Sequence, residues 1–351
     1  MPEHEIYMQR CLQLAELGAG MVSPNPMVGA VIVHEGKIIG EGYHQKYGEA
    51  HAEVNAINHV IANHPNYAEL LAQATIYVSL EPCAHHGKTP PCADLIIKHH
   101  IPTVVVGCRD PFAQVDGKGI EKLLDAGTEV ITGILEADCQ WLNRRFFTKV
   151  QKHRPYIILK WAQTQDGYFA PADKCQYWIT GIESRKLVHK WRSEEDAILA
   201  GKNTVAIDNP QLNTRYWEGK SPKRVVIDRR LELSKDLHVF DQSVETFVFN
   251  DHRTDVDGKI KYIALEDFDR FVPQYILFQL YLQDIQSVII EGGVYTLNTF
   301  IEACLWDEAR IFTGSGNLVS GLKAPEISGH LLAEDNIEDD RLKILTNPAA
   351  I

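Results

Sequence analysis

Length, composition and charge set the first limits on what this chain can be. Its 351 residues exceed what one ordinary hydrophobic core holds, so two domains are expected. A hydrophobic fraction of 45% is typical of a globular protein, and the formal net charge of −12 argues against a protein that binds a nucleic-acid backbone.

The placement of apolar residues and cysteines narrows the class further. No apolar run approaches the roughly 18 residues of a membrane span, so none is expected. The charged, amphipathic N-terminal residues lack the apolar stretch of an export signal. The seven cysteines are scattered rather than spaced as a disulfide framework, which favours a protein of the reducing cytoplasm.

The first part of the chain alternates predicted helices and strands. Helical spacing of apolar residues predicts a helix over residues 6–18, which a loop containing Pro24 and Pro26 ends. Further predicted helices span residues 51–59, 93–99 and 119–126. Predicted strands span residues 27–33, 37–43, 75–80, 103–107 and 129–132, the first two as a hairpin. Together they indicate a sheet with helices on both faces.

A basic segment from Lys149 to Pro155 separates two halves of the sequence. It predicts domains of residues 1–148 and 149–351. After it the alternation restarts, so the second domain is also expected to be α/β. Its predicted strands span residues 156–161, 196–201, 224–228, 245–249, 287–291 and 308–312, and its predicted helices include 183–191 and 295–303.

One histidine and two cysteines carry the strongest chemical signal. His51, Cys83 and Cys92 are ligands of the kinds that zinc prefers, and they favour it over iron. Three ligands leave one coordination position for water, as in a catalytic zinc site. Glu53 is then the proton carrier that a zinc-bound hydroxide mechanism needs. This set of residues predicts a hydrolytic deaminase.

The predicted elements bring these residues together. His51 and Cys92 begin predicted helices, where the helix dipole favours a thiolate, and Cys83 follows the end of a strand. The alternative is that the two cysteines are core residues or half of a structural zinc ribbon. No Cys-x-x-Cys pair accompanies them, however.

Several motifs in the first domain resemble one known family. They are Pro24-Asn25-Pro26-Met27-Val28-Gly29, Gly42-Tyr43-His44, His51-Ala52-Glu53, Leu80-Glu81-Pro82-Cys83 and the segment from His85 to Cys92. They resemble the bifunctional deaminase–reductases of riboflavin biosynthesis, which belong to the cytidine-deaminase-like superfamily. The long segment between the two cysteines distinguishes this family from nucleoside and tRNA deaminases.

The resemblance implies a fold and a first reaction. The fold is a three-layer α/β/α cytidine-deaminase-like domain, and the reaction is zinc-hydroxide deamination of 2,5-diamino-6-ribosylamino-4(3H)-pyrimidinone 5′-phosphate. Asn25 is then expected to hold the edge of the pyrimidine ring; its alternative role is to cap its own turn. His44, His86 and Lys88 are expected to bind the 5′-phosphate, and their alternative is a solvated loop.

The second domain carries a weaker signal of its own. It has no Gly-x-Gly-x-x-Gly, but Gly292-Gly293 follow a predicted strand and precede a helix, where backbone amides can approach a phosphate. Alone, this pattern is equally that of an ordinary turn.

Motifs within residues 160–167, 178–181, 201–205, 208–215 and 226–228 resemble the reductase domain of the same family. The resemblance implies a dihydrofolate-reductase-like α/β domain and NADPH reduction of 5-amino-6-(5-phosphoribosylamino)uracil, with hydride transfer to the ribose C1′ giving a ribityl chain. It assigns to the cofactor Ala162, Trp178, Thr204, Gly292 and Gly293. It assigns to the substrate Gln176, Arg192, Asp208, Leu212, Arg215 and Glu291.

The sequence departs from the family pattern at a few positions. Gln176 and Arg229 stand where the family usually has serine, and Asn209 replaces the more usual second aspartate. Arg229 is either a contact for the 2′-phosphate of the cofactor or a surface arginine.

These observations predict a cytoplasmic bifunctional enzyme with zinc and NADPH as cofactors. Its expected partners are a small-molecule pyrimidine ribose phosphate and further copies of the chain in a homo-oligomer, with neither nucleic acid nor membrane. One alternative is a nucleoside or nucleic-acid deaminase with a nucleotide-binding accessory domain. Another is a non-enzymatic zinc-stabilised binding module, but such a module has no use for Glu53.

Overall fold

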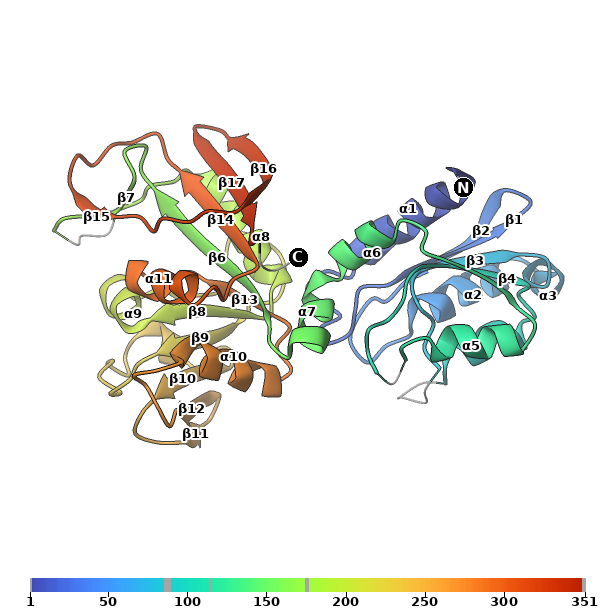
Figure 1. Cartoon of the computed structure of the whole chain (residues 1–351), viewed down its shortest axis with the longest axis horizontal. Coiled ribbons are helices and arrows are strands. Elements are labelled where there is room, and N and C mark those ends of the chain that lie inside the picture. The colour runs from blue at the N-terminus through green and yellow to red at the C-terminus, as the bar shows by residue number, and fades with distance from the viewer. Residues whose placement is uncertain (1, 85–89, 114, 174–176, 349–351) are drawn as a thin grey trace. The chain divides into compact units, whose positions relative to one another are not determined.

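The computed structural model describes residues 2–84, 90–113, 115–173 and 177–348 (Figure 1). The chain divides into two compact units, Met1–Lys152 and His153–Ile351. The division falls at the end of helix α7 (Arg144–Lys152), because the basic residues that resembled a linker continue a helix.

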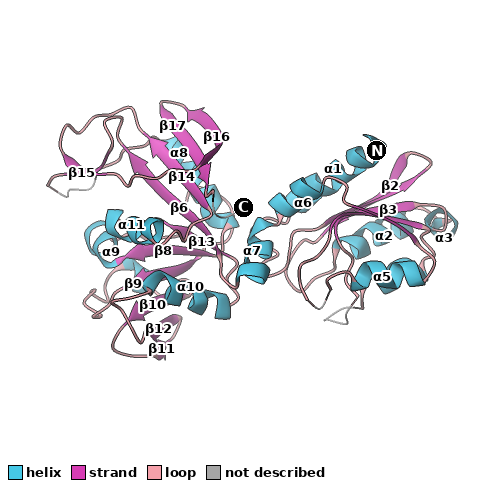
Figure 2. Ribbon diagram, in the orientation of Figure 1, coloured by secondary structure: helices cyan, strands magenta, loops and turns pink. Residues whose placement is uncertain are grey.

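The first unit is built on a five-stranded sheet of order β2-β1-β3-β4-β5. Figure 2 draws its strands in magenta and its helices in cyan. Strand β1 pairs antiparallel with its neighbours β2 and β3, and β3, β4 and β5 are parallel to one another. The strands are β1 (Gly29–His34), β2 (Lys37–Tyr43), β3 (Thr75–Leu80), β4 (Thr103–Cys108) and β5 (Glu129–Thr132). The helices are α1 (Pro2–Glu16), α2 (Ala52–Asn63), α3 (Tyr67–Leu71), α4 (Cys92–Lys98), α5 (Lys118–Asp125), α6 (Glu136–Leu142) and α7.

Alternating residues of the strands supply two separate cores. In β1, Ala30 and Ile32 pack with α2 and α4 on one face, whereas Val31 and Val33 pack with α1 and α6 on the other. This is the period-two pattern of a sheet buried on both sides. Each fully buried aliphatic side chain contributes about 1.5–3 kcal/mol, so the two cores hold the helices on both faces of the sheet. The three-layer α/β/α prediction is confirmed.

The second unit contains a ten-stranded sheet of order β11-β12-β10-β9-β8-β13-β6-β14-β17-β16 and a two-stranded ribbon of β15 and β7. The central strands from β12 to β14 are parallel. In chain order, the first six strands of this unit are β6 (Tyr156–Gln163), β7 (Tyr168–Pro171), β8 (Ala197–Gly201), β9 (Lys223–Ile227), β10 (Thr246–Asn250) and β11 (Asp255–Asp257). The following six strands are β12 (Ile260–Ala264), β13 (Ser287–Ile290), β14 (Glu308–Thr313), β15 (Gly321–Lys323), β16 (His330–Ile337) and β17 (Asp340–Thr346).

Helices pack against this sheet. They are α8 (Ile182–Glu194), α9 (Lys202–Asp208), α10 (Val272–Leu282), α11 (Val294–Glu302) and a 3-10 turn at His238–Phe240. The strands β8 and β13 are buried along their whole length, which explains their continuous apolar sequences. In open parallel sheets, ligands bind outside the carboxyl ends of the strands. Among the described residues, no helix combines the length and apolar character needed to cross a bilayer.

Candidate metal centre and cofactor pocket

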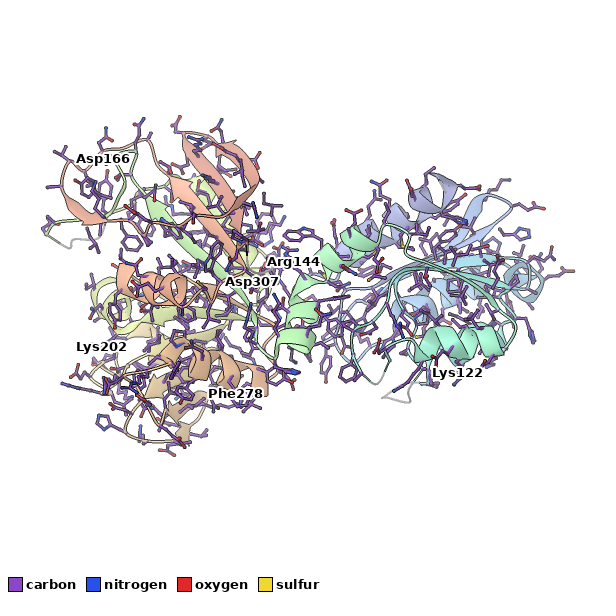
Figure 3. The ribbon with its side chains drawn as sticks, viewed as in Figure 1. Lys122, Arg144, Asp166, Lys202, Phe278 and Asp307 are labelled. Atoms are coloured by element: carbon purple, nitrogen blue, oxygen red, sulfur yellow. The ribbon has the colours of Figure 1, made fainter. Side chains whose placement is uncertain are left out.

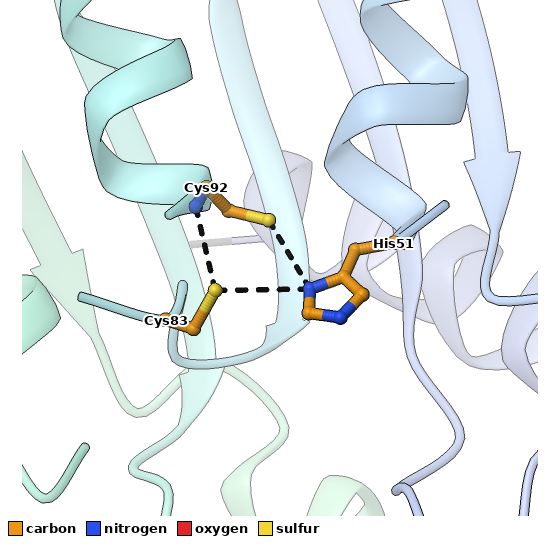
Figure 4. Close-up of side chains that lie close together, drawn as sticks. All are labelled: His51, Cys83 and Cys92. Carbon is orange, nitrogen blue, oxygen red and sulfur yellow. Dashed lines mark hydrogen bonds between the residues drawn. The ribbon is translucent and has the colours of Figure 1, made fainter. Parts of the chain in front are cut away.

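Three segments of the first unit bring His51, Cys83 and Cys92 together (Figure 4). His51 is the N-cap of α2, Cys92 is the first residue of α4, and Cys83 follows the end of β3. The Nδ1 of His51 lies 3.7 Å from the Sγ of Cys83 and 3.3 Å from that of Cys92. All three ligand atoms lie within 4.8 Å of one another, and no further His, Cys, Asp or Glu of the described chain joins them.

The electrostatics of this cluster favour a thiolate at one of its two cysteines. A hydrogen bond from Cys92, together with one from His51, lowers the pKa of the Cys83 thiol, so this group favours the thiolate. The backbone N–H of Cys92 also donates to the Sγ of Cys83, at 3.4 Å. Two sulfur ligands and one imidazole nitrogen fit the preferences of zinc, which these residues can hold while leaving one position open.

Glu53 lies in the first turn of α2 and is only 3% exposed. Burial raises the pKa of its carboxyl to about 6, against the opposing effect of His51. The carboxyl also takes part in a hydrogen bond with Cys92. A carboxyl group whose pKa approaches neutrality can both accept and return a proton near pH 7.

Asn25 and His44 lie beside the candidate metal centre. The amide Nδ2 of Asn25 is 3.1 Å from the Nε2 of His44, whose Nδ1 is 3.0 Å from the carbonyl oxygen of Ala50. The His44 ring stands edge-on to that of His51, with centroids 5.4 Å apart. Burial lowers the pKa of His44, which favours the neutral ring. The other two expected phosphate contacts, His86 and Lys88, lie outside the described residues.

Two buried residues that the sequence analysis did not single out hold the loops around this centre. The Glu81 carboxylate accepts hydrogen bonds from the backbone N–H groups of Asp110, Gly117, Gly119 and Ile120 at 3.0–3.3 Å. The side chain of Asn143 pairs with both the N–H and the carbonyl of Met27, each at 2.8 Å. Glu81 belongs to the Leu80-Glu81-Pro82-Cys83 motif, whereas no sequence motif contains Asn143.

The second unit has a cavity of about 1690 Å³ at the carboxyl ends of β6, β8, β9 and β13. Most residues expected in the reductase site line it, and Gln176 lies outside the described residues. The expected residues on its wall are Ala162, Trp178, Arg192, Thr204, Asp208, Leu212, Arg215, Glu291 and Gly293. Gly292 is not on the wall but adjoins it, and a Cβ on this residue would come within 2.9 Å of Thr296.

A shared carboxylate organises the cations of this cavity. Glu291 follows β13, and its two oxygens receive the Nε and Nη2 of Arg192 at 2.9 and 2.7 Å. The Nζ of Lys160 lies 3.7 Å from the same carboxylate. Although burial alone would raise the pKa of Glu291, Arg192 and Lys160 lower it to about 2. Lys160 stands in a quoted motif but was not assigned a role.

Among the described residues that line the cavity, cations exceed anions. The cations are Lys160, Arg185, Arg192, Lys202, Arg215, Arg229 and Arg230, and the anions are Asp208, Glu232, Asp269 and Glu291. An anionic ligand would therefore be favoured.

Arg229 is engaged by two carboxylates of its own unit. Its Nε donates to Asp251 and its Nη1 to Asp269, both at 2.7 Å. Elsewhere on the cavity wall, the guanidinium of Arg185 stacks over Trp178 at 4.7 Å from the ring centroid.

Comparison with known proteins gives two family matches. Residues 1–108 match the cytidine and deoxycytidylate deaminase zinc-binding region, and residues 155–320 match the RibD C-terminal domain. The chain is 40% identical to the riboflavin biosynthesis protein RibD of Aquifex aeolicus, over 92% of this chain and 89% of that protein. It is 38% identical to RibD of Bacillus amyloliquefaciens, over 92% of this chain and 87% of that protein.

Solved structures are similar over nearly the whole chain. A diaminohydroxyphosphoribosylaminopyrimidine deaminase/5-amino-6-(5-phosphoribosylamino)uracil reductase of Thermotoga maritima has a TM-score of 0.89 and 36% identity, covering 99% of both chains. RibD of Acinetobacter baumannii has a TM-score of 0.88 and 33% identity, covering 98% of this chain and 99% of that one.

Proposed function

Because this chain belongs to the RibD family, the bifunctional deaminase–reductases of riboflavin biosynthesis, we propose that each of its two units carries one reaction. The enzyme is both a hydrolase and an oxidoreductase, and its cofactors are zinc and NADPH. We assign deamination to residues up to Lys152 and reduction to the residues from His153 onward.

The convergence of His51, Cys83 and Cys92 beside the buried Glu53 carries the deaminase assignment. These three side chains would hold the zinc ion, which supplies Lewis-acid activation of water when bound. A carboxylate oxygen of Glu53 takes a proton from the attacking water and delivers it to the departing amine. Burial supports this role because it brings the pKa of Glu53 to about 6.

The substrate of this first reaction is the 5′-phosphate of 2,5-diamino-6-ribosylamino-4(3H)-pyrimidinone. Asn25 binds the polar edge of the pyrimidine ring. The hydrogen bond between Asn25 and His44, whose ring lies next to that of His51, supports this role because it places Asn25 near the candidate metal centre. His44, His86 and Lys88 are proposed for the phosphate, the last two on the family resemblance alone.

The cation excess of the second cavity carries the reductase assignment. Arg192 and Arg215 bind the phosphate or ribose of the substrate, since guanidinium groups match phosphate oxygens. Glu291 holds Arg192 in place. The remaining proposed substrate contacts are Asp208, Leu212, Gln176 and Glu291 itself.

NADPH would be held by Ala162, Trp178, Thr204 and Gly292-Gly293, and it supplies the hydride when bound. A Cβ on Gly293 would lie 3.1 Å from the Oγ1 of Thr204, so glycine leaves the room that a cofactor phosphate needs at the start of α11.

The alternative of a nucleoside or nucleic-acid deaminase with an accessory domain is not favoured. The similarity to RibD proteins extends through both units, not only through the zinc-binding region. The acidic net charge of −12 also disfavours a nucleic-acid substrate.

One pair of variants tests both assignments in the full-length enzyme. Glu53→Gln should abolish ammonia release while zinc content, measured by atomic absorption, stays at the wild-type level. The same protein should still oxidise NADPH when it is given the deaminated intermediate. Arg215→Ala should give the opposite pattern, with normal ammonia release and slow NADPH oxidation. Ammonia release by Glu53→Gln at the wild-type rate would overturn the proposed role of Glu53.

We further propose a homo-oligomer in the cytoplasm. Exposed apolar side chains on α10, among them Phe278 (Figure 3) and Leu282, support a contact between copies. Free thiols support a reducing compartment. Light scattering during size-exclusion chromatography tests the first proposal, and fractionation of cells tests the second.

A further inference from the structure

His189 is a buried imidazole on the wall of the reductase cavity that the assignments above do not use. It lies on α8, one turn before Arg192, and is 4% exposed. Its ring stands edge-on to Tyr216, with centroids 4.9 Å apart and planes at 78°, which fixes the orientation of the ring.

The Nδ1 of His189 accepts a hydrogen bond from the backbone N–H of Arg215, at 2.9 Å. An acceptor nitrogen carries no proton, so the ring is the neutral form with its proton on Nε2. The surroundings also favour the neutral ring. Burial lowers the pKa of His189 to about 4, assisted by the positive charges of Arg192 and Arg215 and, to a smaller extent, of Lys160. Glu291 acts in the opposite direction but does not outweigh them.

The segment that ends at Arg215 needs such an anchor. Its backbone is left-handed at Asn209 and Leu212, with φ of 41° and 47°. Its carbonyl at Asn213 accepts from the Nη1 of Arg192, at 3.2 Å, and the Oδ1 of Asn213 receives the Nη1 of Arg215, at 2.7 Å. His189 therefore supplies a second connection from α8 to this segment, and it does so at the backbone of Arg215 itself.

We propose that His189 is a positioning residue of the reductase: its Nδ1 fixes the backbone of Arg215 so that the guanidinium meets the anionic phosphate of the substrate. An uncharged anchor suits this place, since a further cation among Arg192, Arg215 and Lys160 would add repulsion. The inference rests on the proposed contact between Arg215 and the substrate.

Two substitutions of His189 separate anchoring from simple packing. In His189→Asn the amide oxygen can take the place of Nδ1 and accept the Arg215 N–H, whereas in His189→Leu a side chain of similar reach cannot. We expect His189→Leu to raise the KM for the deaminated intermediate about tenfold, the scale of one lost hydrogen bond with its consequences. The kcat and the Kd for NADP⁺ should stay within about twofold, and His189→Asn should recover most of the loss in KM.

The double variant with Arg215→Ala completes the test. If His189 acts through Arg215, adding His189→Leu to Arg215→Ala should change the KM little further. The inference is overturned if His189→Asn is as damaging as His189→Leu, or if the effect of His189→Leu persists in full without Arg215. It is also overturned if His189→Leu leaves the KM unchanged while Arg215→Ala raises it. An unchanged KM in Arg215→Ala would instead overturn the substrate contact on which the inference rests.

Folding is monitored within the same molecule. Deaminase activity, proposed for the other unit, should be the same in every variant, and circular dichroism should show native secondary structure. His189→Gln, whose amide sits one bond further out than Nδ1, provides a second disrupted anchor if His189→Leu does not fold. It should then show the same rise in KM, and a wild-type KM for it would count against the proposal.

Discussion

The carboxylate of Glu81, two residues before the candidate metal ligand Cys83, holds the backbone of Gly119. Its Oε1 accepts the Gly119 N–H at 3.0 Å, although 38 residues separate the two in sequence. A Cβ on Gly119 would lie only 1.9 Å from the carbonyl oxygen of Pro82. The first turn of α5 and the residue preceding Cys83 are thus in direct backbone contact.

Removing Glu81 should weaken the metal centre without removing a ligand. Glu81→Ala leaves four backbone N–H groups without their acceptor, so the backbone that carries them, including the first turn of α5 against Pro82, should loosen. We expect zinc affinity to fall about 10- to 100-fold, the usual effect of losing a residue that orients metal ligands. Competition with a chromophoric chelator measures it. The control is Glu121→Ala, an exposed acid on α5, and equal affinities of the two variants would contradict the prediction.

Asn143 should matter for both stability and substrate binding in the first unit. Its side chain is 2% exposed and pairs with both backbone groups of Met27, two residues beyond Asn25. Asn143→Ala leaves a donor and an acceptor unpaired, which should lower the free energy of unfolding by about 1–3 kcal/mol and raise the deaminase KM. Urea denaturation and steady-state kinetics check this. The exposed Asn63, whose amide bonds only its own helix, provides the control Asn63→Ala.

Acid should selectively remove the contribution of Glu291 to stability. Its folded pKa is about 2, against about 4.3 in an unfolded chain, so its contribution is present above about pH 4.3 and lost as the pH falls toward 2. At pH 7 we expect Glu291→Gln to be less stable than the wild type, by on the order of 2 kcal/mol. The difference should shrink between about pH 4.5 and 2.

Tryptophan fluorescence is a suitable probe for this comparison, because every tryptophan except Trp141 lies in the second unit. Glu302→Gln changes an exposed acid on α11 and should show no such dependence. A gap between Glu291→Gln and wild type that stays constant down to pH 2 would contradict the assignment.

Arg229 should contribute little to cofactor binding. Two carboxylates already receive its guanidinium, so a phosphate would have to compete with Asp251 and Asp269. We expect Arg229→Ser to change the Kd for NADP⁺ by less than about twofold, as is usual for an exposed ion pair. Isothermal titration calorimetry measures it, with Thr204→Ala as the variant expected to bind more weakly. A large loss in Arg229→Ser would favour the 2′-phosphate contact instead.

The sequence predicted those features that depend on residue type and local period. His51, Cys83 and Cys92 were recognisable because few roles need that set of side chains, and the buried strands because their apolar runs are continuous. The strand β16 was missed because it is largely exposed and its apolar and polar residues do not alternate. Glu81, Asn143 and His189 were not assigned because each acts on backbone 26 to 116 residues away, a distance that no local pattern encodes.

The separation of the chain at Lys152 has a consequence for genetics. In the part of the chain that the structure describes, every candidate metal ligand lies before this residue and every residue on the wall of the large cavity lies after it. A lesion in one half therefore leaves the other half's active site intact. Two strains that carry Glu53→Gln and Arg215→Ala on separate copies of the gene should complement each other, whereas two lesions within the same half should not.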